Sequence, residues 1–276
     1  MSVETVTPAE SIKPQDRVTG LMGSAFAARQ AGKLTDAAEH LELALVEARK
    51  TPYDMEFQTR IQLGMSLADV YVELGEIEKA SEMLVSEVAF AERVSQVIQA
   101  TGTPSQKRSA TGGFLQVRDR SIQVKLLGSE SPEIDVRDWL VGGVSSLAEL
   151  REQVVLLEFW ATWCKPCQEM FPKLNKLHES EAKNGLNVIA LTRYYMAYGG
   201  TEESKLDERK LMQGVIDQHQ TGFHVGIAPD ESLQAVFGAN GLPTLVLIDR
   251  TGIIQYIGPG EDDVTFNKKL QQALKA

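Results

Sequence analysis

Both cysteines of this chain lie in one pentapeptide, Trp163-Cys164-Lys165-Pro166-Cys167, and the 276-residue sequence contains no others. Two thiols at this spacing can close a small disulfide ring if the first lies at the start of a helix. There, unpaired backbone N–H groups and the helix dipole favour a thiolate. The motif therefore predicts dithiol–disulfide chemistry.

The residues on either side of the pair predict a strand followed by a helix. Residues 154–161 are mostly apolar and rich in β-branched and aromatic side chains, which is typical of a buried central strand. Pro166 suits the first turn of a helix, and Pro172 is expected to kink that helix further along. The predicted order is strand, cysteine pair, helix.

These residues resemble a known family. The run Phe-Trp-Ala-Thr-Trp-Cys-Lys-Pro-Cys at 159–167 resembles the active site of the thioredoxin superfamily. Leu-Pro-Thr at 242–244 resembles the second signature of that family, a proline with a cis peptide bond facing the cysteines. Ile-Asp-Arg-Thr-Gly at 248–252 resembles the turn that follows in the TlpA-like branch. That branch usually carries an acid where this chain has Met170. The resemblance implies an α/β thioredoxin fold, a central mixed sheet flanked by helices, over residues 114–276.

Three side chains are the predicted catalytic residues. Cys164 is the predicted nucleophile, because an exposed position at a helix start beside Lys165 favours the thiolate. Cys167, one turn further in, would be shielded and would resolve the mixed disulfide. The resemblance places a buried carboxylate at Glu158, whose pKa desolvation would raise and which could then relay a proton to Cys167. The alternative for Glu158 is a strand residue that faces solvent.

The client is expected to bind beside the cysteines. A cis bond at Pro243 would leave the backbone of Leu242 free to pair with an extended client segment next to Cys164. No cofactor other than the redox disulfide is expected, and no metal, because the gap from Cys167 to His219 far exceeds the ~12 to 15 residues of a compact zinc finger. The predicted substrate-binding residues come from both signatures: Trp163, Lys165, Pro166, Leu242 and Pro243.

The predicted function is a thiol–disulfide oxidoreductase acting on protein disulfides, more often as a reductant. Since the chain has only two thiols, each cycle needs an external dithiol or disulfide partner. The Lys165-Pro166 pair does not set the direction of electron flow. Two alternatives stay open: an interaction protein with a vestigial redox domain, and a thiol peroxidase. A thiol peroxidase fits poorly, because peroxiredoxins have a Thr or Ser three residues before the reactive cysteine, whereas Thr162 lies two residues before Cys164.

Residues 14–100 are predicted to form an all-α domain that recruits clients or dimerises. Apolar side chains recur there at helical spacing, and Gly32 and Gly75 each precede a small residue, Ala37 and Ala80, by the same interval. This resembles a pair of tetratricopeptide repeats with extended helices. Two helical hairpins without repeat ancestry are the alternative.

Three further segments complete the predicted organisation. Residues 1–13 are expected to be a disordered lead. Residues 101–113 are rich in glycine and small polar residues and predict a linker, followed by a β hairpin over 114–124. In 193–220, three tyrosines either shape a client groove or cover an inserted helix at 202–219.

Charge and hydropathy restrict the partners and the compartment. A formal net charge of −10 argues against nucleic acid or an anionic membrane as partner. No apolar run approaches the ~20 residues of a membrane helix, and residues 1–20 lack the apolar core of a secretory signal. The sequence as given therefore predicts a cytoplasmic protein; the periplasm or cell envelope is the alternative if a native export segment is missing from it.

Overall fold

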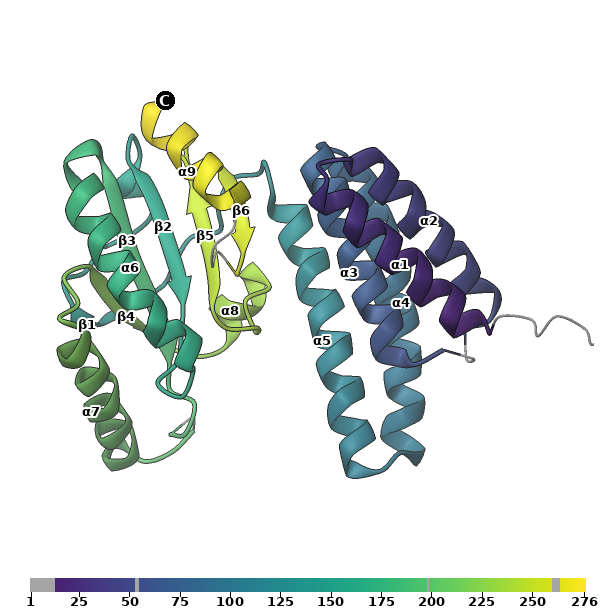
Figure 1. Cartoon of the computed structure of the whole chain (residues 1–276). Coiled ribbons are helices and arrows are strands. Elements are labelled where there is room, and N and C mark those ends of the chain that lie inside the picture. Colours follow the sequence, from purple (N-terminus) through teal and green to yellow (C-terminus); the bar gives the residue numbers. More distant parts are fainter. Residues whose placement is uncertain (1–12, 53–54, 198, 260–263) are drawn as a thin grey trace, which may run out of the picture. The chain divides into compact units, whose positions relative to one another are not determined.

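The computed structural model describes residues 13–52, 55–197, 199–259 and 264–276. They form two compact units, divided along the chain between Val117 and Arg118. Figure 1 shows the first unit as helices and the second as a sheet covered by helices. The predicted disordered lead lies outside the described residues except for Lys13.

The first unit consists of helices that pack as consecutive neighbours. Gly32 and Gly75 adopt the left-handed backbone conformation, with φ of 73° and 80°, and so permit the tight turns between the paired helices. Ala37 and Ala80 are completely buried, so the helices of each pair approach closely. The predicted helical unit is confirmed, whereas its relationship to tetratricopeptide repeats stays a prediction. Its helices are α1 (Pro14–Gln30), α2 (Leu34–Lys50), α3 (Phe57–Leu74), α4 (Ile77–Thr101) and the first part of α5 (Pro104–Leu126).

Helix α5 overturns two predictions. The segment 101–113 is not a linker, and 114–124 is not a hairpin, because the helix runs through almost all of both. Ala110, Val117 and Val124 are all buried and recur at heptad spacing, which is the stripe of an amphipathic helix. The short apolar–polar alternation within 114–124 fits this helical stripe as well as it fits a strand.

Gly113 shows why a glycine-rich stretch was mistaken for a linker. A Cβ atom at this position would lie 2.7 Å from Cε1 of Phe57 and 3.2 Å from Cγ1 of Ile61. The glycine therefore permits α5 to pack closely on α3. Gly113 permits a contact between two helices and does not act as a hinge.

The second unit is built on a six-stranded mixed sheet. Its strand order is β1-β4-β3-β2-β5-β6, with β2 parallel to β3 and antiparallel to β5. This is the predicted central mixed sheet, and the active-site strand lies inside it. The strands are β1 (Asp138–Val141), β2 (Val154–Phe159), β3 (Leu186–Arg193), β4 (His224–Ala228), β5 (Thr244–Ile248) and β6 (Ile254–Gly258).

Helices cover both faces of the sheet. Side chains of β2 alternate between two cores: Leu156 belongs to the core with the cysteines, and Leu157 to the opposite one. Both faces of this strand are therefore buried, as its apolar sequence predicts. The cysteine side carries α6 (Lys165–Glu181), α7 (Glu202–His219) and α9 (Val264–Lys275), and the other side carries α8 (Ser232–Phe237). Two short 3₁₀ helices, η1 (Ala148–Leu150) and η2 (Ala182–Asn184), lie in the connections.

The last turns of α5 also belong to this unit. Gln123 Nε2 donates to the carbonyl oxygen of Gly238 at 2.7 Å, and Asn240 Nδ2 donates to Asp119 Oδ1 at 3.1 Å. These bonds hold the segment just before the Leu242-Pro243 signature. The thioredoxin-like unit therefore begins inside a helix.

Candidate active site

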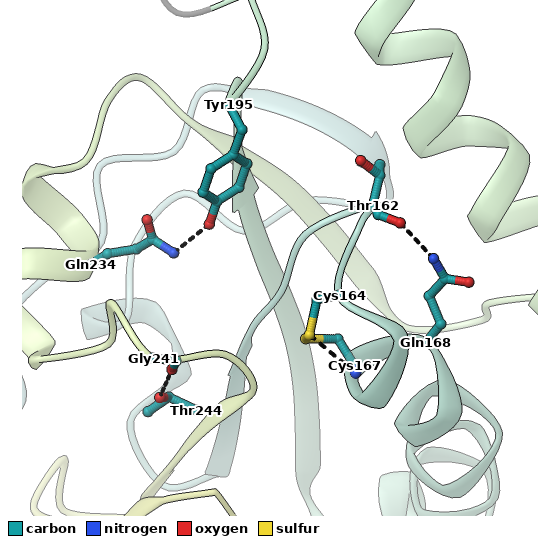
Figure 2. The surroundings of a disulfide bond; sticks show 8 residues. All are labelled: Thr162, Cys164, Cys167, Gln168, Tyr195, Gln234, Gly241 and Thr244. Atoms are coloured by element: carbon teal, nitrogen blue, oxygen red, sulfur yellow. Dashed lines mark hydrogen bonds between the residues drawn. A yellow bond between two sulfur atoms is a disulfide. The ribbon is translucent and has the colours of Figure 1, made fainter. Parts of the chain in front are cut away.

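The two cysteines form a disulfide at the N-terminus of α6 (Figure 2). Cys164 is the residue that caps the helix, and its Sγ accepts a hydrogen bond from the backbone N–H of Cys167 at 3.3 Å. The Cα atoms of the pair lie 5.3 Å apart. The predicted order of strand, cysteine pair and helix is confirmed, with Pro166 in the first turn and Pro172 within the helix.

The two cysteine residues differ less in exposure than the sequence predicted. Cys164 is 5% exposed and Cys167 is 0% exposed. The expectation of an exposed Cys164 is therefore wrong for this oxidised form, because the residue joins a core that includes Phe171 of α6. Cys164 is still the more accessible of the two. The Lys165 ammonium pairs with Glu169 at 3.6 Å, and both side chains are exposed, so water screens its effect on the thiol.

Glu158 is buried on the same face of the sheet as the disulfide. It pairs in register with Ala190 of β3 and Leu245 of β5, and both belong to the core that contains the cysteines. The side chain is 0% exposed, and neither carboxyl oxygen has a hydrogen-bond partner among the described residues. Burial therefore raises the pKa of Glu158 well above its usual value. The alternative of a solvent-facing side chain is wrong.

The second signature lies at the same edge of the sheet. The Leu242-Pro243 peptide bond is cis, as the resemblance predicted. Thr244 pairs with Phe159, the last residue of β2, so this turn lies beside the segment that leads to the cysteines. Figure 2 draws the hydrogen bond of 2.6 Å from Thr244 Oγ1 to the carbonyl oxygen of Gly241, which closes the turn.

One tyrosine of the 193–197 segment reaches the redox motif. The ring of Tyr195 packs edge-on against Trp163, with ring centroids 5.4 Å apart, and Trp163 is 61% exposed. Gln234 Nε2 donates to the Tyr195 hydroxyl at 2.7 Å (Figure 2), and the guanidinium carbon of Arg193 lies 4.2 Å from the ring centroid. Burial raises the pKa of Tyr195, whereas the hydrogen bond from Gln234 and the positive charge of Arg193 lower it. Tyr194 instead contacts Asp138, with 3.4 Å between the hydroxyl and Oδ2.

Sequence reasoning left open whether the tyrosines of this segment shape a client groove or cover an inserted helix, and it missed the residues that hold Tyr195. Gln234 lies in α8 and is 4% exposed, and a lone glutamine in a short helix carries no sequence signal. On the other side of the motif, Gln168 Nε2 donates to the carbonyl oxygen of Thr162 at 2.6 Å and fixes the approach to the helix. Tyr198, the third tyrosine, lies outside the described residues.

The histidines of the second unit make contacts of their own within the protein. Among the residues with described positions, no group of three or more His, Cys, Asp and Glu side chains could hold a metal ion. His224 Nδ1 instead accepts the backbone N–H of Gly143 at 3.0 Å, and burial lowers the pKa of this imidazole. Within the same part of the chain, no helix has the length and apolar character to cross a membrane.

A redox disulfide that caps the helix after a central strand, beside a cis-proline turn, defines a thiol–disulfide oxidoreductase of thioredoxin fold. The family model described as AhpC/TSA matches residues 127–257. The thiol-disulfide oxidoreductase ResA of Bacillus thuringiensis is 32% identical over 135 residues, 48% of this chain and 70% of the relative. The chain belongs to the TlpA-like branch of the thioredoxin superfamily. Met170, at the position where that branch usually has an acid, is buried beside the cysteines.

Two further comparisons each cover about half of this chain. The thioredoxin-like protein YneN of Bacillus subtilis is 29% identical over 147 residues, 53% of this chain and 78% of that protein. A crystal structure of a thiol-disulfide isomerase from Corynebacterium glutamicum aligns with a TM-score of 0.45 and 24% identity. It covers 54% of this chain and 97% of that structure.

The buried carboxyl group makes stability depend on pH, and Glu158→Gln should remove that dependence. In the unfolded chain Glu158 titrates near 4.5, whereas in the folded chain it keeps its proton to a higher pH. Folding therefore takes up a proton between the two values. The free energy of unfolding of the wild type should fall as pH rises through this window, by at most about 1.4 kcal/mol per pH unit relative to the variant.

Urea unfolding of the oxidised protein at several pH values measures this difference. Well below pH 4.5, Glu158 is protonated in both the folded and the unfolded chain. The difference in free energy of unfolding between wild type and variant should therefore be constant there. Glu169→Gln, which removes an exposed carboxyl from α6, is the control and should follow the wild type. Parallel profiles for wild type and Glu158→Gln would contradict a raised pKa.

Proposed function

We propose that the Cys164–Cys167 pair exchanges with disulfides of protein clients, with Cys164 attacking and Cys167 resolving. The observation that carries this proposal is the position of Cys164, which caps α6 and is the more exposed of the two cysteine residues. The helix N-terminus stabilises the thiolate of Cys164 in the reduced protein. Cys167, shielded one turn further in, is within bonding reach of Cys164 and attacks only after a client has bound covalently.

The exchange balances without any group besides the client. The Cys164 thiolate attacks one sulfur of a client disulfide, a Cys164–client bond forms, and the other client sulfur leaves and takes up a proton. Cys167 then loses its proton and attacks Cys164, so that the internal disulfide forms and the second client sulfur leaves. The client takes up two electrons and two protons, one proton released by Cys167 and one from water, because Cys164 enters the first step as a thiolate. In reverse, the same steps oxidise a client dithiol, and an external thiol or disulfide partner restores the pair in either direction.

Glu158 is the proposed proton acceptor for Cys167 in this cycle. Its support is burial on the cysteine face with a raised pKa, because a carboxylate with a raised pKa is a stronger base towards a neighbouring thiol. The attack by Cys167 requires a thiolate, and a buried thiol needs a nearby base to form one.

Replacing the carboxyl by an amide should slow the resolving step. Glu158→Gln is expected to lower the rate of protein-disulfide reduction by about 100-fold or less, most strongly near neutral pH, because proton transfer then depends on water. Stopped-flow reduction of insulin from about pH 6 to about pH 9 measures this, with Glu169→Gln as the matched control. Equal rates for Glu158→Gln and wild type at every pH would leave Glu158 with a structural role alone.

Single cysteine variants should separate the attacking from the resolving thiol. Cys167→Ser leaves Cys164 able to attack a client but unable to release it. Covalent complexes that a thiol reductant cleaves should therefore accumulate. Cys164→Ser should accumulate few. Non-reducing electrophoresis of the full-length variants incubated with insulin shows both. The opposite pattern would reverse the assignment, and insulin turnover by Cys164→Ser equal to wild type would support the vestigial-scaffold alternative.

The helical unit is proposed to recruit clients or a second copy of the chain. Large apolar side chains remain exposed on its helices, which a bound protein would cover. Those more than half exposed are Phe26, Leu43, Val46, Val85 and Val97.

A chain that starts at Thr103 should keep the chemistry and lose recruitment. It retains the whole of α5, whose last turns bond to the segment before the cis-proline turn. We expect the redox potential and the rate with hydroxyethyl disulfide to match those of the full chain. The rate with a protein client should fall, or the oligomeric state should change. Circular dichroism checks that the fragment is folded. A shifted potential in a folded fragment would show that residues 14–102 influence the cysteines.

A further inference from the structure

Glu208 is a second buried carboxylate, and the exchange steps do not use it. It lies in α7 and is 2% exposed. Its Oε1 accepts the backbone N–H of Tyr195 at 2.9 Å and of Met196 at 3.2 Å, and its Oε2 accepts Met196 at 3.1 Å and Ala197 at 2.8 Å. Three successive N–H groups of one loop thus converge on one side chain. Such bonds to a charged acceptor offset the cost of burying it.

The loop that Glu208 holds is the one that brings Tyr195 to the redox motif. Tyr195 is fixed at three points: its backbone N–H on Glu208, its hydroxyl on Gln234, and its ring beneath Arg193. Arg193 Nε also donates to Gln234 Oε1 at 2.7 Å, so the last two supports are joined to each other. The ring is therefore held at one orientation beside Trp163.

The surface that results is aromatic and adjoins the reactive sulfur. Trp163 is the residue before Cys164 and is 61% exposed, and Met196, next to Tyr195, is 64% exposed. The hydroxyl of Tyr195 is bonded to Gln234, and its ring stands nearly perpendicular to that of Trp163, with an interplanar angle of 84°. Trp163 directly precedes Cys164 in the chain, so this aromatic pair begins at the redox motif itself.

We propose that Tyr195 and Trp163 form a wall that binds the client chain beside its disulfide, and that Glu208 is the residue that positions this wall. The proposal rests on the proposed exchange with protein clients. A protein or peptide client brings chain on both sides of its disulfide, whereas a small disulfide brings none. The wall therefore contributes to client affinity and not to the attack of Cys164. Its loss should raise KM for a protein client and leave kcat unchanged.

Kinetics with two substrates test the wall. Tyr195→Ala should raise KM for insulin about 2- to 12-fold, the range expected from losing an aromatic contact of about 0.5–1.5 kcal/mol, and leave kcat unchanged. Its rate with hydroxyethyl disulfide should stay within about twofold of wild type. Tyr195→Phe keeps the ring but loses the bond to Gln234, so its KM for insulin should lie between those of wild type and Tyr195→Ala. An unchanged KM for insulin in Tyr195→Ala would overturn the wall.

Glu208→Gln tests the positioning role. An amide presents an N–H₂ group where a carboxylate oxygen accepts, so the loop should loosen and KM for insulin should rise as in Tyr195→Ala. Glu203→Gln, the same change at an exposed position of α7, is the control and should match wild type. The near-ultraviolet circular dichroism of the Tyr195–Trp163 pair, identified by subtracting the spectrum of Trp163→Phe, should weaken in Glu208→Gln while the far-ultraviolet spectrum is kept. An unchanged near-ultraviolet spectrum would overturn the role of Glu208.

These outcomes are distinct from failure of the proposed function. If the wild type reduces no insulin but oxidises a reduced dithiol peptide, the same KM comparison is made with that peptide. If the wild type acts on neither substrate, the proposed exchange with protein clients is wrong, and so is the proposed client-binding wall. The dichroism of Glu208→Gln still decides whether this carboxylate positions Tyr195.

Discussion

The site depends on the central position of β2 in the sheet. Parallel pairing with β3 puts the carboxyl ends of both strands at one edge, and antiparallel pairing with β5 puts the start of β5 there too. Phe159 is thus in register with Leu191 on one side and with Thr244 on the other. The cysteine segment, the Tyr195 loop and the cis-proline turn meet because each continues from one of these three strand ends. Burial of β2 on both faces holds that arrangement.

Two glutamates show how differently the same buried side chain can be used. Glu158 lies in an apolar strand without a hydrogen-bond partner among the described residues, so its neutral form is favoured and its pKa is raised. Glu208 is buried almost as fully, yet it accepts bonds from three backbone N–H groups. The first is therefore suited to exchanging a proton with a thiol. The second is suited to fixing a loop, since each oxygen already has its donors.

Local pattern was enough to predict what depends on neighbours in sequence. The capping position of Cys164, the strand before it and the helix at 202–219 follow from spacing and periodicity within a few turns of chain. Gln234 and Glu208 could not be predicted, because their partners lie 39 and up to 13 residues away and only the folded sheet brings them together. The same holds for the burial of Cys164, which results from packing against a core that no local pattern describes.

The boundary of the redox unit shows where composition misleads. Glycine and small polar residues before position 114 indicated a linker, yet the chain there is a helix whose last turns bond to the segment before the cis-proline turn. Gly238 has φ of 59°, and a Cβ atom there would lie 2.5 Å from the carbonyl oxygen of Asp119. Only glycine fits so close to α5. Because Leu242 and Pro243 follow within a few residues, the end of α5 supports the cis-proline turn, and the redox unit includes this end.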